Sequence, residues 1–142
     1  CDFRIVTKCA QLSLPEMKIG MIPGSGGSVR LARMIGLSRV KDMIMRGKRI
    51  SGEEAFNWGL ASELVEKDKL EVTISKLVDE LCSVSPLAQR AIKTVLNTSQ
   101  DAPLHVAIEL EGETYGRLRS SDDFNEGVKS FVEKRKPVYK GN

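Results

Sequence analysis

Glu16 is the residue whose type and setting most clearly suggest chemistry. It follows an alternating apolar run and Pro15, and a glycine-rich segment comes directly after it. A carboxylate at the end of a strand is held by a rigid element, so it can exchange a proton with a substrate carbon. Its apolar neighbours Leu14, Met17 and Ile19 would disfavour the charged form through desolvation, which suits a general acid or base. A solvated loop glutamate is the alternative.

The glycine-rich segment 21–28 contains Pro23, Gly24, Gly26 and Gly27 and predicts a tight, irregular turn. Backbone amides at such a turn can bind phosphate at the start of a helix. The spacing matches neither the Walker motif nor the dinucleotide-binding pattern. A turn that needs left-handed backbone or close chain approach is the other interpretation, and the residues alone favour it.

The C-terminal segment 131–140 combines Phe131 with a run of cations that includes Lys134. Basic side chains at a helix end complement the helix dipole, which explains them without a ligand. Alternatively, Phe131 offers an aromatic face to a base while Lys134 meets a phosphate. Nucleic acid is a weaker interpretation, because aromatic residues are not interleaved with the cations and the net charge is only +3.

The remaining reactive residue types indicate no metal or disulfide site. His105 is the single histidine, and one histidine cannot form a metal cluster. The three cysteines stand at unrelated spacings, which fits neither a disulfide framework nor a zinc site. The chain has 41% hydrophobic and 29% charged residues, typical of a globular protein, and no apolar run approaches membrane-spanning length.

The elements that must position these residues are a few short strands followed by helices. Alternation predicts strands at 2–8 and 10–14, and a brief strand at 61–65. Ser25 or Ser28 would cap a helix that stops at Gly36, and a final helix would run from Ser121 towards Pro137. Further signals are a capping box at 51–54 and a cap followed by proline at 85–86. Two strands make a marginal sheet, so they belong to a larger one supplied by an absent N-terminal part.

The ordered combination of these motifs resembles the enoyl-CoA hydratase/isomerase (crotonase) family, and the resemblance covers essentially the whole chain. The motifs that carry it, in chain order, are Cys1-Asp2, Pro15-Glu16, Gly20, Pro23-Gly24, Gly26-Gly27, Arg30-Leu-x-Arg33-x-x-Gly36, Gly47-Lys-Arg-Ile-Ser-Gly-Glu-Glu-Ala55, Gly59-Leu60, Ser85-Pro86 and Glu126-Gly-x-x-x-Phe131-x-Glu-Lys-Arg135.

The resemblance implies an α/β fold, a crotonase-like ββα spiral followed by a helical oligomerisation region. Residues 1–66 would be the C-terminal part of the spiral core, and residues 67–142 the helical trimerisation region. A homo-oligomer, trimer or hexamer, is expected. The parent protein's N-terminal half would supply a second glutamate and both oxyanion-hole donors.

The same resemblance implies an acyl-CoA thioester substrate. Glu16 would be the catalytic residue, and Pro23, Gly24, Phe131 and Lys134 would bind substrate. Several relatives, such as dienoyl-CoA isomerases and hydroxyacyl-CoA hydrolases, place an aspartate where this chain has Gly24, so glycine there together with Glu16 favours enoyl-CoA hydratase. A Δ3,Δ2-enoyl-CoA isomerase and a non-catalytic assembly fragment are the alternatives. We expect no cofactor besides the substrate's coenzyme A, no metal, no nucleic-acid or membrane partner, an inactive isolated chain, and a cytoplasmic or mitochondrial location.

Overall fold

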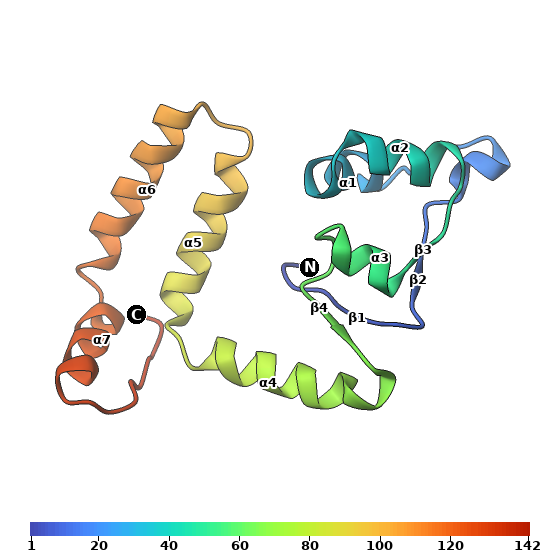
Figure 1. The fold of residues 1–142 in the computed structure, drawn as a ribbon. Coiled ribbons are helices and arrows are strands. Elements are labelled where there is room, and N and C mark those ends of the chain that lie inside the picture. The colour runs from blue at the N-terminus through green and yellow to red at the C-terminus, as the bar shows by residue number, and fades with distance from the viewer. The chain divides into compact units, whose positions relative to one another are not determined.

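The structure, a computed structural model, describes residues 1–142 as two compact units, Cys1–Ser75 and Lys76–Asn142 (Figure 1). The first unit contains the strands and three helices, and the second is helical. Helix α4, Leu70–Cys82, carries the boundary between them. The division of function at residue 66, between spiral core and trimerisation region, stays a prediction.

Four short strands form two separate pairs in the first unit. Strand β1 (Ile5–Thr7) runs parallel to β4 (Glu63–Val65), with Ile5 opposite Glu63. Strand β2 (Gln11–Leu12) is antiparallel to β3 (Ile50–Ser51). The strands predicted at 2–8 and 10–14 were therefore too long. Each strand here has a single neighbour, so the ladder ends where that neighbour ends.

Three α-helices, two 3-10 turns and the start of α4 complete the first unit. The three helices and two turns are η1 (Glu16–Ile19), α1 (Gly27–Ile35), α2 (Leu37–Met45), α3 (Gly52–Asn57) and η2 (Lys67–Lys69). The capping box at α3 is confirmed: the Ser51 hydroxyl accepts from the Glu54 amide, and the Glu54 carboxylate accepts from the Ser51 amide. The predicted serine cap of α1 is wrong. Gly26 is the N-cap, in the left-handed region, and no side chain caps the helix.

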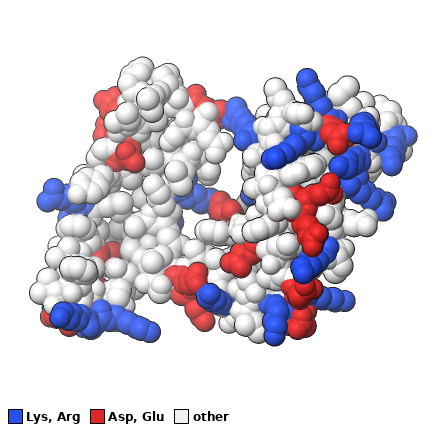
Figure 2. Space-filling model, viewed as in Figure 1, with Lys and Arg blue, Asp and Glu red and all other residues white.

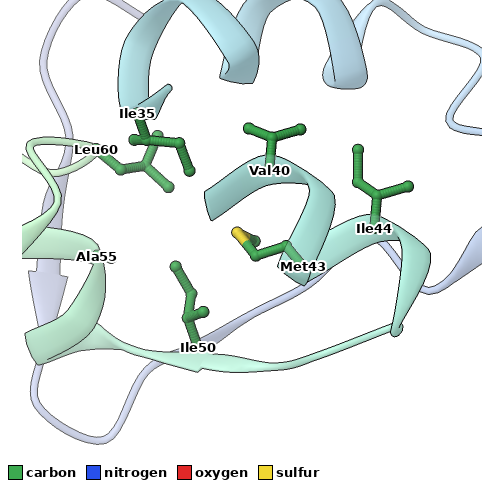
Figure 3. Packing of buried hydrophobic residues seen from close by; sticks show 7 residues of the cluster. All are labelled: Ile35, Val40, Met43, Ile44, Ile50, Ala55 and Leu60. Carbon is green, nitrogen blue, oxygen red and sulfur yellow. The ribbon is translucent and has the colours of Figure 1, made fainter. Parts of the chain in front are cut away.

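A small aliphatic core holds the first unit together (Figure 3). Met43 from α2 and Ile50 from β3 are each only 1% exposed and lie at its centre. The other buried members are Ile35, Val40, Ile44, Ala55 and Leu60. Leu12 and Leu14 pack against this cluster from the segment that leads to Glu16. The core therefore anchors the chain on the N-terminal side of the candidate acid.

The second unit consists of the end of α4 and three further helices. Helices α5 (Pro86–Ser99) and α6 (Leu104–Leu118) pack against each other, and α7 (Asp122–Val132) follows. The predicted Ser85-Pro86 start is confirmed, with the Ser85 hydroxyl accepting from the Ala88 amide. The last helix ends at Val132 and not near Pro137, because Lys134 adopts a left-handed conformation. No helix is both long and apolar enough to cross a membrane.

Candidate active site

Glu16 begins the 3-10 turn η1, four residues after strand β2 ends at Leu12. Pro15 directly precedes it and has no amide hydrogen to donate to a ladder, so the strand pairing does not continue through this position and the chain turns. The turn is closed by the Lys18 amide, which donates to the Pro15 carbonyl at 2.9 Å, and by Gly20 in the left-handed region at φ 76°. The Met21 amide donates to the Glu16 carbonyl at 3.1 Å. The backbone of Glu16 is therefore fixed on both sides by hydrogen bonds.

The Glu16 side chain is half-buried, and its Oε2 atom is shielded from solvent without any hydrogen-bond partner. Buried carboxylate oxygens in folded proteins are nearly always satisfied, so an orphan of this kind calls for an explanation. An oxygen reserved for a substrate provides one, because a general acid or base must have a free lone pair or proton facing its reactant.

The 3-10 turn η1 contacts the connection between α2 and β3. A Cβ on Gly47 would lie 2.6 Å from Cε of Lys18, so the lysine's alkyl chain lies directly on this glycine. Gly47 has φ 58°, which places it in the region that glycine adopts most easily. A side chain at position 47 would therefore push Lys18, and with it the turn that carries Glu16.

The glycine-rich turn folds back against the strand end that precedes Glu16. Pro23 is buried, and Gly24 is exposed with no atom within 4 Å of where its Cβ would be. A Cβ on Gly27 would lie 3.4 Å from a Leu14 methyl and 3.7 Å from Cβ of Pro23. The structure thus brings Pro23 and the start of α1 to Leu14, two residues before Glu16.

The surface around this turn is apolar and cationic. Several apolar side chains are exposed here: Ile19 (78%), Met21 (60%), Ile22 (69%) and Val29 (62%). Residues 17–50 contain eight lysines and arginines and a single acid, Asp42. Figure 2 shows blue side chains gathered over this part of the first unit. A positive field attracts anionic ligands, and an exposed apolar rim suits an acyl chain or a second protein surface.

Phe131 and Lys134 lie together at the end of α7 in the second unit. The Lys134 amide donates to the Phe131 carbonyl at 3.3 Å. The Phe131 ring is 85% exposed and lines a groove of about 510 Å³ with side chains from α5, α6 and α7, among them Tyr115 and Phe124. Glu16, Pro23 and Gly24 belong to the first unit, whereas Phe131 and Lys134 belong to the second.

Two carboxylates of α7 hold the chain that follows it, which the sequence analysis did not anticipate. Glu126 makes a two-point ion pair with Arg135, at 2.6 and 2.9 Å, and also accepts from the Val138 amide. These contacts lower the pKa of Glu126 to about 2 and raise the pKa of Arg135. Asp123 is 3% exposed and accepts from the Ser85 hydroxyl and the Lys140 and Gly141 amides, which lowers its pKa.

The other sequence candidates are placed at the surface or in packing roles. His105 and all three cysteines are exposed, and the cysteines are free. Trp58 packs against the first unit's core, with the Arg39 guanidinium and the Lys48 ammonium over its ring at 5.4 and 5.5 Å from the centroid. The structure brings together no group of three or more histidine, cysteine, aspartate or glutamate residues suited to hold a metal ion.

Comparison with known proteins decides the family. The model for "Enoyl-CoA hydratase/isomerase" matches residues 1–142, the full length of the chain. The chain belongs to the enoyl-CoA hydratase/isomerase family. The predicted resemblance is thereby confirmed, and with it the crotonase-like α/β fold.

Curated relatives of this family member include hydratases and dehydratases of CoA esters. It is 39% identical to methylglutaconyl-CoA hydratase 1, mitochondrial, of Pyricularia oryzae, over 98% of this chain and 44% of that protein. It is 34% identical to the carnitinyl-CoA dehydratase of Salmonella typhi, over 99% of this chain and 55% of the relative. The chain thus spans about half the length of these curated relatives.

A solved structure of an enoyl-CoA hydratase from Bacillus anthracis superposes on the hydratase/isomerase chain with a TM-score of 0.96 at 37% identity. The superposition includes 100% of this chain and 55% of the Bacillus anthracis chain. An enoyl-CoA hydratase from Geobacillus kaustophilus gives a TM-score of 0.93 at 35% identity, with 54% of that chain covered.

Proposed function

We propose that this chain is the C-terminal half of an enoyl-CoA hydratase, which adds water reversibly to trans-2-enoyl-CoA and yields 3-hydroxyacyl-CoA. The observation that carries the proposal is the buried, unpartnered Oε2 of Glu16 beside the glycine-rich turn. Three further facts support it: the family match, relatives named as hydratases of CoA esters, and glycine in place of an acid at position 24.

In the proposed reaction Glu16 transfers the proton at the α-carbon. Water adds at the β-carbon of the conjugated thioester and gives one proton to the glutamate that positions it, while the electrons move onto the thioester oxygen as an enolate. Glu16 then donates a proton to the α-carbon, and in the reverse direction it removes that proton. Backbone donors that stabilise the enolate oxygen would supply the largest catalytic effect. We assign those donors and the water-positioning glutamate to the other half of the parent protein, so the isolated chain would be inactive.

The substrate's coenzyme A would supply the negative charge that the cationic surface of residues 17–50 attracts. Pro23 and Gly24 would shape the substrate side of the turn, and Gly24 leaves open space there because no atom lies near its Cβ position. Phe131 and Lys134 would receive the adenine ring and a phosphate of the coenzyme A bound to a neighbouring subunit. The reaction as proposed needs no further cofactor.

We also infer a homo-oligomer, either a trimer or a hexamer. Its support is the number of exposed apolar side chains on the helices of the second unit, such as Leu96, Leu104 and Ile108, which are between 58% and 76% exposed. Solvent-exposed apolar area of this extent is typical of an interaction surface. Sedimentation equilibrium of the 15.7 kDa chain tests this inference, and a monomer at high concentration would contradict it.

The experiment for the activity is Glu16→Gln in the parent enzyme that contains this chain, assayed with crotonyl-CoA. We expect kcat to fall by about 10²–10⁴-fold, the usual contribution of a general acid or base. The circular dichroism spectrum should not change, because the amide keeps the carboxylate's shape. Glu71→Gln, which alters an exposed glutamate of α4, is the matched control and should keep full activity. An unchanged rate in Glu16→Gln would contradict the proposal.

A Δ3,Δ2-enoyl-CoA isomerase is the second candidate. Glu16 is the one residue in the chain with a buried, unpartnered side-chain oxygen, and a single carboxylate suffices to move a proton between two carbons. The parent enzyme should therefore also be assayed with a 3-enoyl-CoA. Isomerisation without hydration would favour this candidate, and neither activity would favour an assembly role for the chain.

A further inference from the structure

The turn that ends α7 contains a lysine where the backbone favours glycine. The Arg135 amide donates to the Ser130 carbonyl at 3.1 Å, and the Lys134 amide donates to the Phe131 carbonyl. These two bonds define a Schellman motif, whose left-handed position is usually occupied by glycine or asparagine. Lys134 has φ 54° and is the only residue other than glycine with a positive φ.

A side chain with a Cβ disfavours this conformation, so other contacts must hold it. The Glu126–Arg135 pair supplies them. Arg135 directs Nη1 and Nη2 at the two carboxylate oxygens of Glu126, and its Nε donates to Glu133 at 2.5 Å. Glu126 lies on the body of α7 and Arg135 lies beyond the turn, so the pair, which we call the tail clamp, bridges the turn on either side of Lys134.

Phe131 belongs to the stretch of chain that the tail clamp spans. Phe131 lies between Glu126 and the turn on the same helix, and its ring is exposed at the groove instead of packed in a core. A purely structural helix end would gain more from burying this ring than from exposing it. An exposed ring next to a lysine whose backbone is held in one conformation is an arrangement suited to a ligand that carries both an aromatic base and a phosphate.

We propose that Glu126 and Arg135 are positioning residues, which hold Lys134 in the left-handed turn and thereby present its ammonium together with the Phe131 ring to a phosphate-bearing ligand. This inference rests on the proposed function, in which Phe131 and Lys134 receive coenzyme A. Because the clamp orders Lys134 before the ligand arrives, binding does not have to supply that order.

The test is calorimetric titration of the parent enzyme that contains this chain, with coenzyme A and with pantetheine, which has the same thiol arm but no phosphate. Arg135→Lys keeps the charge but cannot form the two-point pair. Glu126→Gln keeps the shape and removes the ion pair. We expect each variant to weaken coenzyme A binding by about 3- to 10-fold, the cost of ordering one long side chain on binding. Pantetheine binding should not change.

A double variant distinguishes an effect of Arg135 on the position of Lys134 from a general destabilisation of α7. Lys134→Ala alone should weaken coenzyme A binding, and adding Arg135→Lys to it should produce no further loss, because the group being positioned is gone. Lys76→Gln removes an exposed cation that pairs with Glu80 in α4, and as the matched control it should bind like the unaltered enzyme. Circular dichroism of every variant verifies that α7 is retained.

The outcomes distinguish the two proposals. If Lys134→Ala binds coenzyme A as tightly as the unaltered enzyme, or if the unaltered enzyme does not bind it, the assignment of Lys134 to the substrate fails and the positioning inference fails with it. If Lys134→Ala weakens binding while Arg135→Lys and Glu126→Gln do not, the inference alone is overturned. Additive losses in the double variant would also overturn it.

Discussion

Gly52 lies where strand β3 enters helix α3, at a point of contact between two backbones. Its amide donates to the Ala10 carbonyl at 2.9 Å, and a Cβ at this position would lie 2.0 Å from the carbonyl oxygen of Thr7. The Thr7 carbonyl also accepts from the Ala10 amide at 3.0 Å, so it cannot turn away freely. Gly52→Ala should therefore be strongly destabilising.

The size of the effect follows from the geometry. A carbon atom approaches a carbonyl oxygen to about 3.3 Å at the closest ordinary contact. The observed 2.0 Å therefore requires the two backbones to separate by about 1.3 Å, that is 3.3 minus 2.0. Overpacking usually costs about 1–3 kcal/mol, and because backbone must move here we expect about 3 kcal/mol or more. The displaced segment leads through β2 to Glu16, so the candidate acid would shift too.

Urea unfolding followed by Trp58 fluorescence measures this cost, because the single tryptophan lies in the first unit beside its core. Gly24→Ala is the matched control: it is the same substitution in the same unit, but no atom lies within 4 Å of the new methyl group. We expect the control to change the free energy of unfolding by less than about 0.5 kcal/mol. A Gly52→Ala variant as stable as this control would refute the close approach.

Two further predictions concern the core and the tail. Met43→Ala should lower the free energy of unfolding by about 2–5 kcal/mol because it leaves a cavity, whereas Met45→Ala, at a 66% exposed site, should cost less than about 0.5 kcal/mol, both measured by the same fluorescence assay. Acid should weaken the contacts by which Glu126 and Asp123 hold residues 135–141, the chain after α7. The folded pKa of Glu126, about 2, lies below its ordinary value of 4.5, so its stabilisation is present above pH 4.5 and is lost as the pH falls towards 2. The pKa of Asp123 is also lowered, so its contribution is lost in acid too. The midpoint temperature of thermal unfolding, followed by circular dichroism between pH 7 and 2, should fall as the pH drops below 4.5. In Glu126→Gln it should fall less steeply. A midpoint temperature that does not change with pH would contradict this assignment.

Local signals in the sequence predicted the caps and turns where side chains decide the structure. Ser51 with Glu54, and Ser85 with Pro86, form the caps expected from their spacing because each cap needs only neighbours in sequence. The start of α1 was mispredicted. Both serines near it are plausible caps by type, but Gly26 takes the left-handed conformation that the turn requires.

The candidate site was predicted in part for the same reason. Glu16 at the end of an alternating run can be recognised from residue types, but the burial of its Oε2 atom without a hydrogen-bond partner is a property of the folded chain that no local pattern encodes. The tail clamp could not be predicted. Glu126 and Arg135 are nine positions apart and meet only because Lys134 adopts a conformation that its residue type disfavours.

The parallel pairing of β1 with β4 also has a consequence for the order of events during synthesis. Ile5 pairs with Glu63, so this ladder cannot begin to close until 58 further residues have been made. At about 5–20 residues per second, the wait is roughly 3–12 s. Helices α5 and α6, in contrast, are neighbours in sequence and can pair soon after they emerge. Strand β1 therefore waits for seconds on the ribosome before its partner β4 is available, and during that time the side of β1 that β4 will cover is open to misassociation.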